Sequence, residues 1–214
     1  MAERRAPHRK RRERTIDRPR LLGFEALRQV NGDGGYANLV TAQVTAGLDA
    51  RDAGFVTELV HGTCRRQGSY DMIIERAAGR VLNSLQPAVV DVLRLACHQL
   101  FAMRVPVHAA VASSVDLAGV AIGERVTGLV NAIVRKLATR SWDEWLAALT
   151  AGLPERTSLA VRHAHPQWIV DAFAAALASD ETELAALLEA DNQPPVPMLV
   201  VRPGLADVAE LTAG

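Results

Sequence analysis

Three residues of types that suit binding share one face of the segment ERVTGLVNAIVRKL, residues 124–137. At 100° per residue, Gly128, Asn131 and Arg135 fall together on the side opposite a regular apolar stripe. Asn is a poor helix-interior residue, and Gly costs about 1 kcal/mol there relative to Ala. An amide and a guanidinium four residues apart can bond to each other, to exposed carbonyls or to phosphates. We expect this face either to dock a partner or to act as an internal polar clamp that fixes helix packing.

The densest charge lies at the start of the chain. Residues 1–20 hold nine of the 24 basic residues and three of the 24 acidic ones, a balance of +6, so the rest of the chain balances at −6. Residues 1–16 lack apolar periodicity and are expected to be a basic, disordered arm. Such an arm favours phosphate contacts with RNA, although a solubilising tail is the alternative. The predicted RNA-binding residues are Arg4, Arg5, Arg9, Lys10, Arg11, Arg12, Arg14, Arg18 and Arg20.

Other reactive residue types give weaker signals. Cys64 and Cys97 lie inside helical patterns without metal-type spacing, which favours packing roles in a reducing, cytoplasmic setting. His163 and His165 are two residues apart on a helical segment and have no third ligand nearby, so no metal site is expected. No apolar run approaches the roughly 18 residues of a membrane span, so no membrane partner is expected.

The elements that position these residues are predicted to be helices. Hydrophobic residues make up 49% of the chain and aromatic residues only 4%, a composition typical of packed helices. Asp17 is suited to N-cap the first helix, and residues 87–103, apolar over most of their circumference, are predicted to form the central buried helix. Ser141 and Glu144 have capping-box spacing, and three helices should follow over 156–164, 166–178 and 180–191. The short apolar run 198–201 is typical of a buried strand.

Three blocks of the chain carry a family resemblance. The stretches RDAGFVTELVHGTCRRQGSYDMII (51–74), LRLACHQLFAMRVPVHAAVASSVDLA (93–118) and GLVNAIVRKL (128–137) resemble successive blocks of the NusB-like helical domain. That domain occurs alone in the antitermination factor NusB and at the N-terminus of the RsmB (Sun/Fmu) family of 16S rRNA cytosine-C5 methyltransferases. The stretches HAHPQWIVDAF (163–173) and LLEADNQPPVPMLVVRPG (187–204) resemble the connection found in the methyltransferases. Pro203 departs from the polar residue expected at its position.

The resemblance implies an all-α fold with an added strand. We expect a basic arm over 1–16, a NusB-like RNA-binding domain over 17–140, a helical connector over 141–192, and the truncated start of an α/β methyltransferase region over 193–214. The expected partners are ribosomal RNA and the protein's own C-terminal methyltransferase domain.

The implied function is docking of the enzyme on small-subunit rRNA. The longer protein would transfer methyl groups from S-adenosylmethionine to cytosine C5. The cofactor fold and catalytic cysteines are expected beyond Gly214, so these 214 residues are predicted to be inactive alone, with no catalytic, cofactor-binding or metal residues. The alternative is a NusB-type transcription antitermination factor that binds leader RNA and a ribosomal protein.

Catalysis within the chain itself is weakly supported. Methylation at C5 needs a thiolate nucleophile, and neither Cys64 nor Cys97 lies in the proline–cysteine context that the family uses. The glycine-rich stretch NGDGGY (31–36) lies between two predicted helices, whereas a dinucleotide-type fingerprint follows a strand. Both cysteines are therefore expected to be packing residues.

Overall fold

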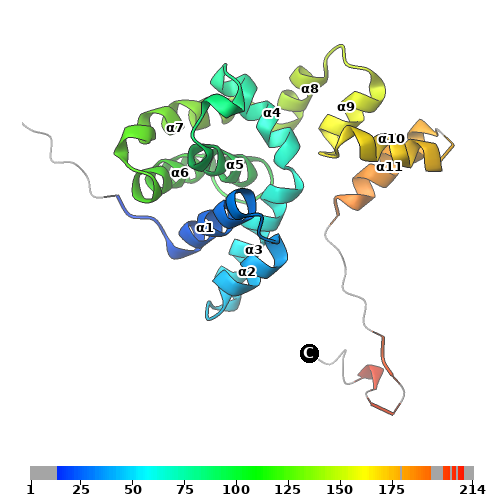
Figure 1. Ribbon diagram of the computed structural model, residues 1–214, viewed down its shortest axis with the longest axis horizontal. Helices are drawn as coiled ribbons and strands as arrows, with labels where there is room; N and C mark the ends of the chain where they lie inside the picture. The colour runs from blue at the N-terminus through cyan, green and yellow to red at the C-terminus, as the bar shows by residue number, and fades with distance from the viewer. Residues whose placement is uncertain (1–13, 179, 194–199, 203, 206, 210–214) are drawn as a thin grey trace, which may run out of the picture.

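The computed structural model describes residues 14–178, 180–193, 200–202, 204–205 and 207–209. Over these ranges the chain is all-helical and contains no strand (Figure 1), as the predicted all-α class requires. Seven helices form the first part: α1 (Arg18–Asp33), α2 (Ala37–Thr45), α3 (Ala50–Arg65), α4 (Gln67–Ala78), α5 (Pro87–Phe101), α6 (Val107–Ala121) and α7 (Glu124–Leu137). A short 3-10 helix, η1 (Leu82–Ser84), precedes α5, and the second part contains α8 (Trp142–Thr150), α9 (Glu155–Arg162), α10 (Gln167–Ala176) and α11 (Glu181–Asp191).

Helix α5 is the centre of the first part, as its sequence predicted. All residues from Val89 to Gln99 are buried, because α1, α3, α4, α6 and α7 pack around it. Its buried charges are paired: Asp91 accepts hydrogen bonds from Arg28, Asn31 and Arg94. A buried carboxylate with three donors avoids the desolvation penalty of an unpaired charge.

Local capping sets several helix starts. The Asp17 side chain accepts a hydrogen bond from the backbone N–H of Arg20, and a proline in the first turn fits the fixed helical φ. Ser141 and Glu144 form the predicted capping box at α8, each side chain accepting a hydrogen bond from the other residue's backbone N–H. These two predictions are confirmed.

The second part has a core of its own. Helices α9, α10 and α11 bury Leu159, Val170, Leu184 and Leu188 against one another. Helix α8 belongs partly to the first core, since Trp145 is 2% exposed there and its indole N–H donates to the Leu137 carbonyl at 3.0 Å. The first connector helix is therefore attached to the bundle.

The first and last segments of the chain lie partly outside the described residues. Contacts begin before residue 17, because Ile16 packs against the main core and Arg14 forms ion pairs. Most of the predicted arm, residues 1–13, lies outside the described residues. So do Met198 and Leu199 of the predicted strand, while Val200 and Val201 lie in neither a helix nor a strand. Among the described helices, none is both long enough and apolar enough to cross a bilayer.

Candidate functional site

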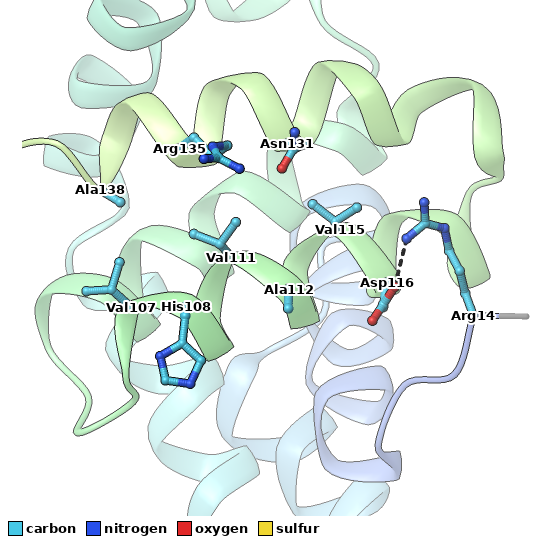
Figure 2. Close-up of a pocket in the computed structure, with 10 residues that line it drawn as sticks. All are labelled: Arg14, Val107, His108, Val111, Ala112, Val115, Asp116, Asn131, Arg135 and Ala138. Carbon is cyan, nitrogen blue, oxygen red and sulfur yellow. Dashed lines mark hydrogen bonds and ion pairs between the residues drawn. The ribbon is translucent and has the colours of Figure 1, made fainter. Parts of the chain in front are cut away.

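A groove between α6 and α7 brings predicted site residues from distant parts of the sequence together. The helices lie side by side and are joined through Gly123, whose φ of 133° favours glycine (Figure 2). The groove has a volume of about 720 Å³. Its lining consists of Arg14, Val107, His108, Val111, Ala112, Val115, Asp116, Asn131, Arg135 and Ala138.

The floor of the groove is apolar and its edges are polar. Val107, Val111 and Val115 recur every four residues along α6, so they share one face of that helix, and Figure 2 shows Val111 and Val115 directed toward α7. Asn131 and Arg135 project from α7 above this floor (Figure 2). An apolar floor with a few polar side chains at its edge is the usual composition of a recognition surface.

The predicted face of α7 is open. Within the described ranges, neither Asn131 nor Arg135 forms a hydrogen bond or ion pair with its side chain, and Arg135 is exposed. A Cβ added at Gly128 would meet no described atom within 4 Å. If Asn131 and Arg135 formed an internal clamp, their partners would have to lie outside the described residues. A docking face, in contrast, would have unpaired side chains before its partner binds, as these two residues have.

Arg14 closes one end of the groove. Its guanidinium donates to Asp116 of α6 at 2.7 Å and to Glu124 of α7 at 2.6 Å. The Arg14 side chain lies against the α6 backbone at Gly119, where a Cβ would overlap it. The glycine thus leaves room for the arginine, and these contacts fix the place where residues 1–13 join the described fold.

The other described members of the predicted RNA-binding set do not line the groove. Arg20 donates to Gln99 at 2.7 Å and to Asp17 at 2.8 Å, and its guanidinium lies 4.9 Å from the centroid of the Phe55 ring. Arg18 is exposed at the start of α1. Any phosphate contact by Arg14 or Arg20 has to compete with these internal partners. The remaining six residues of the set, at positions 4, 5, 9, 10, 11 and 12, lie outside the described residues.

Sequence reasoning missed three residues that shape this site: Asp116, Gly119 and Glu124. Asp116 and Glu124 are 102 and 110 residues from Arg14 along the chain, so no local pattern could indicate the pairing. His108 is also part of the site, because it is exposed at the start of α6 and lines the groove. In the sequence, His108 lies three and four residues before Val111 and Ala112. This spacing could have indicated that the three residues lie close together on one helix face.

The cysteines are poorly suited to nucleophilic chemistry. Cys97 is completely buried, and that burial raises the pKa of its thiol well above the usual value. Burial also raises the pKa of Cys64, with the Arg94 charge opposing it. A raised pKa lowers the thiolate fraction, as expected of packing residues.

The paired histidines contact carboxylates rather than each other's ring. His163 lies 3.2 Å from Glu189, and His165 lies 2.9 Å from Asp191. In the described part of the chain, no group of three potential metal ligands is found.

The glycine-rich stretch 31–36 does not have the setting of a nucleotide-binding fingerprint. Nucleotide-type cofactors bind where a glycine-rich turn follows a strand and begins a helix. Here the glycine-rich stretch joins α1 to α2, and Gly34 ends α1 in the left-handed conformation. The groove of Figure 2 lies between two helices and has an apolar floor.

Comparison with known proteins places these observations in a family. The model of the NusB family matches residues 17–139. A candidate methyltransferase of Mycobacterium tuberculosis strain CDC 1551 is 40% identical over 204 residues, covering 94% of this chain and 45% of that protein. Ribosomal RNA small subunit methyltransferase B of Pseudomonas putida KT2440 is 32% identical over 158 residues, covering 73% of this chain and 34% of the relative.

A more distant methyltransferase and a solved structure agree with these matches. Ribosomal RNA small subunit methyltransferase B of Escherichia coli strain S88 is 26% identical over 176 residues, covering 82% of this chain and 38% of the enzyme. The crystal structure of PH0851 matches with a TM-score of 0.64 at 14% identity, over 86% of this chain and 40% of that one, which supports the fold alone. The chain spans less than half the length of the curated relatives it matches. The family model matches residues 17–139, and these residues contain the helical bundle. The chain therefore belongs to the NusB family, and its relatives include proteins named ribosomal RNA small subunit methyltransferase B.

Proposed function

We propose that this chain is the RNA-docking part of a longer rRNA methyltransferase. The observation that carries the proposal is the meeting of Arg14, at the end of the basic arm, with the open Asn131 and Arg135 at one groove. The arm supplies a dense positive charge, and the groove supplies directional donors beside an apolar floor. Phosphate contacts of this kind position a protein on RNA without reading its bases.

Methyl transfer itself would belong to another part of the protein. The relatives are named as methyltransferases, and an S-adenosylmethionine-dependent C5 reaction on cytosine follows from the family resemblance. The fragment on its own should bind RNA and transfer no methyl group. The bundle and the connector would hold the catalytic part at a fixed place relative to the docked RNA.

The antiterminator alternative has less support. The alignment with the mycobacterial relative spans 204 residues, whereas the NusB match ends at residue 139. Similarity to methyltransferase-named relatives thus continues through the connector helices, which a stand-alone antiterminator would not need.

The arm is tested by neutralising its charge. In the test variant, Gln replaces six residues, namely Arg4, Arg5, Arg9, Lys10, Arg11 and Arg12. Each phosphate that the arm neutralises contributes about 0.7 to 0.9 to the slope of log affinity against log salt. We expect the variant to bind small-subunit rRNA fragments at least about tenfold more weakly, with a slope smaller by about three or more. Fluorescence anisotropy across a salt series measures both quantities.

The control for the six-residue variant is a single substitution outside the arm. Arg51→Gln removes an exposed guanidinium on α3 and should change neither quantity appreciably. Unchanged affinity and slope in the six-residue variant would mean that the arm only solubilises the chain. If calorimetry showed that the wild-type fragment binds S-adenosylmethionine, this would contradict the proposal that methyl transfer belongs to another part of the protein.

A further inference from the structure

A second basic pocket lies where α4, α7 and α8 pack together. Arg76 belongs to the last turn of α4, Lys136 to the last turn of α7, and Arg140 to the turn before α8. With Thr139 and Trp145 they line a hollow of about 260 Å³. None of these residues lines the groove of Figure 2.

The lining of this pocket carries three positive charges and no carboxylate. All three cationic residues are exposed, and in the described part of the chain none of them forms an ion pair with a carboxylate. Glu144 is close enough for the Arg140 charge to help lower its pKa, but the hydrogen bonds from Ser141 are the larger cause. The Glu144 carboxylate thus already accepts the hydrogen bond from the Ser141 backbone N–H in the capping box. The three like charges repel one another unless an anion lies between them.

Arg140 is held in place on a rigid support. Its guanidinium lies 4.9 Å from the centroid of the Trp145 ring. The indole is itself fixed, because it is 2% exposed and its N–H donates to the Leu137 carbonyl. A stacked arginine keeps its N–H donors available at the edge of the guanidinium plane. The pocket therefore has one preorganised donor and two exposed cations.

Helix dipoles explain only part of this arrangement. Cations are favoured in the last turn of a helix, which accounts for Arg76 on α4 and Lys136 on α7 taken one at a time. The dipoles do not account for three cations around one hollow that no carboxylate lines. Pockets for drug-sized ligands start at about 300 Å³, so this smaller hollow suits a compact anion.

We propose that Arg76, Lys136 and Arg140 form a phosphate-binding pocket that takes a backbone phosphate of the docked RNA. The proposal rests on the proposed RNA-docking function and adds a contact point away from the arm and the groove. A stacked guanidinium and an exposed ammonium suit one phosphodiester, whose two free oxygens accept both kinds of donor.

The test is a triple variant of the full chain, Arg76→Gln, Lys136→Gln and Arg140→Gln, with the arm intact. We expect its affinity for small-subunit rRNA fragments to fall about tenfold and its salt slope to fall by about one. A matched control replaces three other exposed arginines, Arg51→Gln, Arg104→Gln and Arg202→Gln, and should change the affinity much less. Thermal unfolding of the wild type and of both variants, with inorganic phosphate or chloride at equal ionic strength, accompanies the binding assay.

Each outcome decides a different point. If the wild type binds RNA and the triple variant binds as tightly, or if the control weakens binding equally, the pocket is overturned and RNA docking stands. If the wild type does not bind RNA, the proposed function fails and RNA is overturned as the source of the phosphate. In that case, phosphate that raises the Tm of the wild type but not of the triple variant would assign the pocket to free phosphate instead.

Discussion

Arg14 has internal partners that its sequence context does not predict. In the sequence it is the last of seven basic residues between positions 4 and 14, and it is expected to bind phosphate. In the structure it pairs with Asp116 and Glu124 over Gly119. Partly exposed ion pairs contribute only about 0–1 kcal/mol, so the main effect of Arg14 is positional. It fixes the end of the arm beside the groove.

His98 is the buried titratable residue with the clearest consequence for stability. Its ring contacts the Tyr70 hydroxyl at 2.9 Å and the Glu58 carboxylate at 3.1 Å, and Gly62 leaves the space that the ring fills. Burial lowers the pKa of His98 below its usual 6.5, and the Glu58 charge only partly opposes this shift. The unfolded chain therefore binds more protons than the folded one as the pH falls through about 6.5.

This residue makes stability depend on pH in a definite direction. The free energy of unfolding should be largest above about pH 6.5 and should decrease as the pH falls below it, because protonation favours the unfolded chain. His98→Gln should reduce that slope without abolishing it, since burial also lowers the pKa of His163. Urea unfolding between about pH 7.5 and 5.5, above the range where most carboxylates titrate, measures the effect.

The control for this prediction is another imidazole. His108 is exposed at the start of α6, and His108→Gln should retain the wild-type dependence. A wild-type stability that rises on acidification over this range would show that the Glu58 charge outweighs burial at His98.

At the scale of elements, α7 offers the sharpest prediction. Asn131→Ala with Arg135→Ala removes two side chains that lack partners among the described residues, so the free energy of unfolding should change by less than about 0.5 kcal/mol. Loss of a charge-assisted contact should weaken binding to small-subunit rRNA about tenfold. Chemical denaturation and anisotropy, run on the same preparations, measure the two effects.

The opposite pattern would identify an internal clamp. Under that alternative, the double variant would lose stability and keep its affinity for RNA. Arg104→Ala, which removes one exposed guanidinium outside the groove, is the matched control and should alter neither quantity by much.

Most of the helices could be predicted from local patterns. The cap at Asp17, the capping box at Ser141, and the apolar character of residues 87–103 each depend on neighbours within a few turns. Helix ends were placed within one or two residues where such signals exist. The face of α7 that carries Gly128, Asn131 and Arg135 also follows from the periodicity of that helix.

The parts that could not be predicted depend on long-range packing. Arg14 meets its partners across more than 100 residues, and Gly119 resembles any small residue in an alanine-rich helix. Likewise Arg76 joins Lys136 and Arg140 only because α4 packs against α7. No periodicity or spacing in the sequence indicates that these residues lie close together in the fold.

At the scale of the whole molecule, the described helices form two hydrophobic cores along the chain. The bundle around α5 presents the groove, while α9 to α11 form a second small core further along the chain. The second basic pocket is lined by residues of α4, of α7, of the turn into α8 and of α8 itself. Under the two proposals, RNA would contact α7 both at the groove and at this pocket.

The most direct test of this account is to map where RNA touches the chain. Ultraviolet cross-linking of the wild-type chain to a small-subunit rRNA fragment, followed by mass spectrometry of the peptides, gives the contact positions. The account predicts cross-links in the peptides of residues 1–14, in those of α6 and α7 around Asn131 and Arg135, and near Arg140. Cross-links confined to α10 and α11, or none at an RNA concentration that saturates binding, would contradict it.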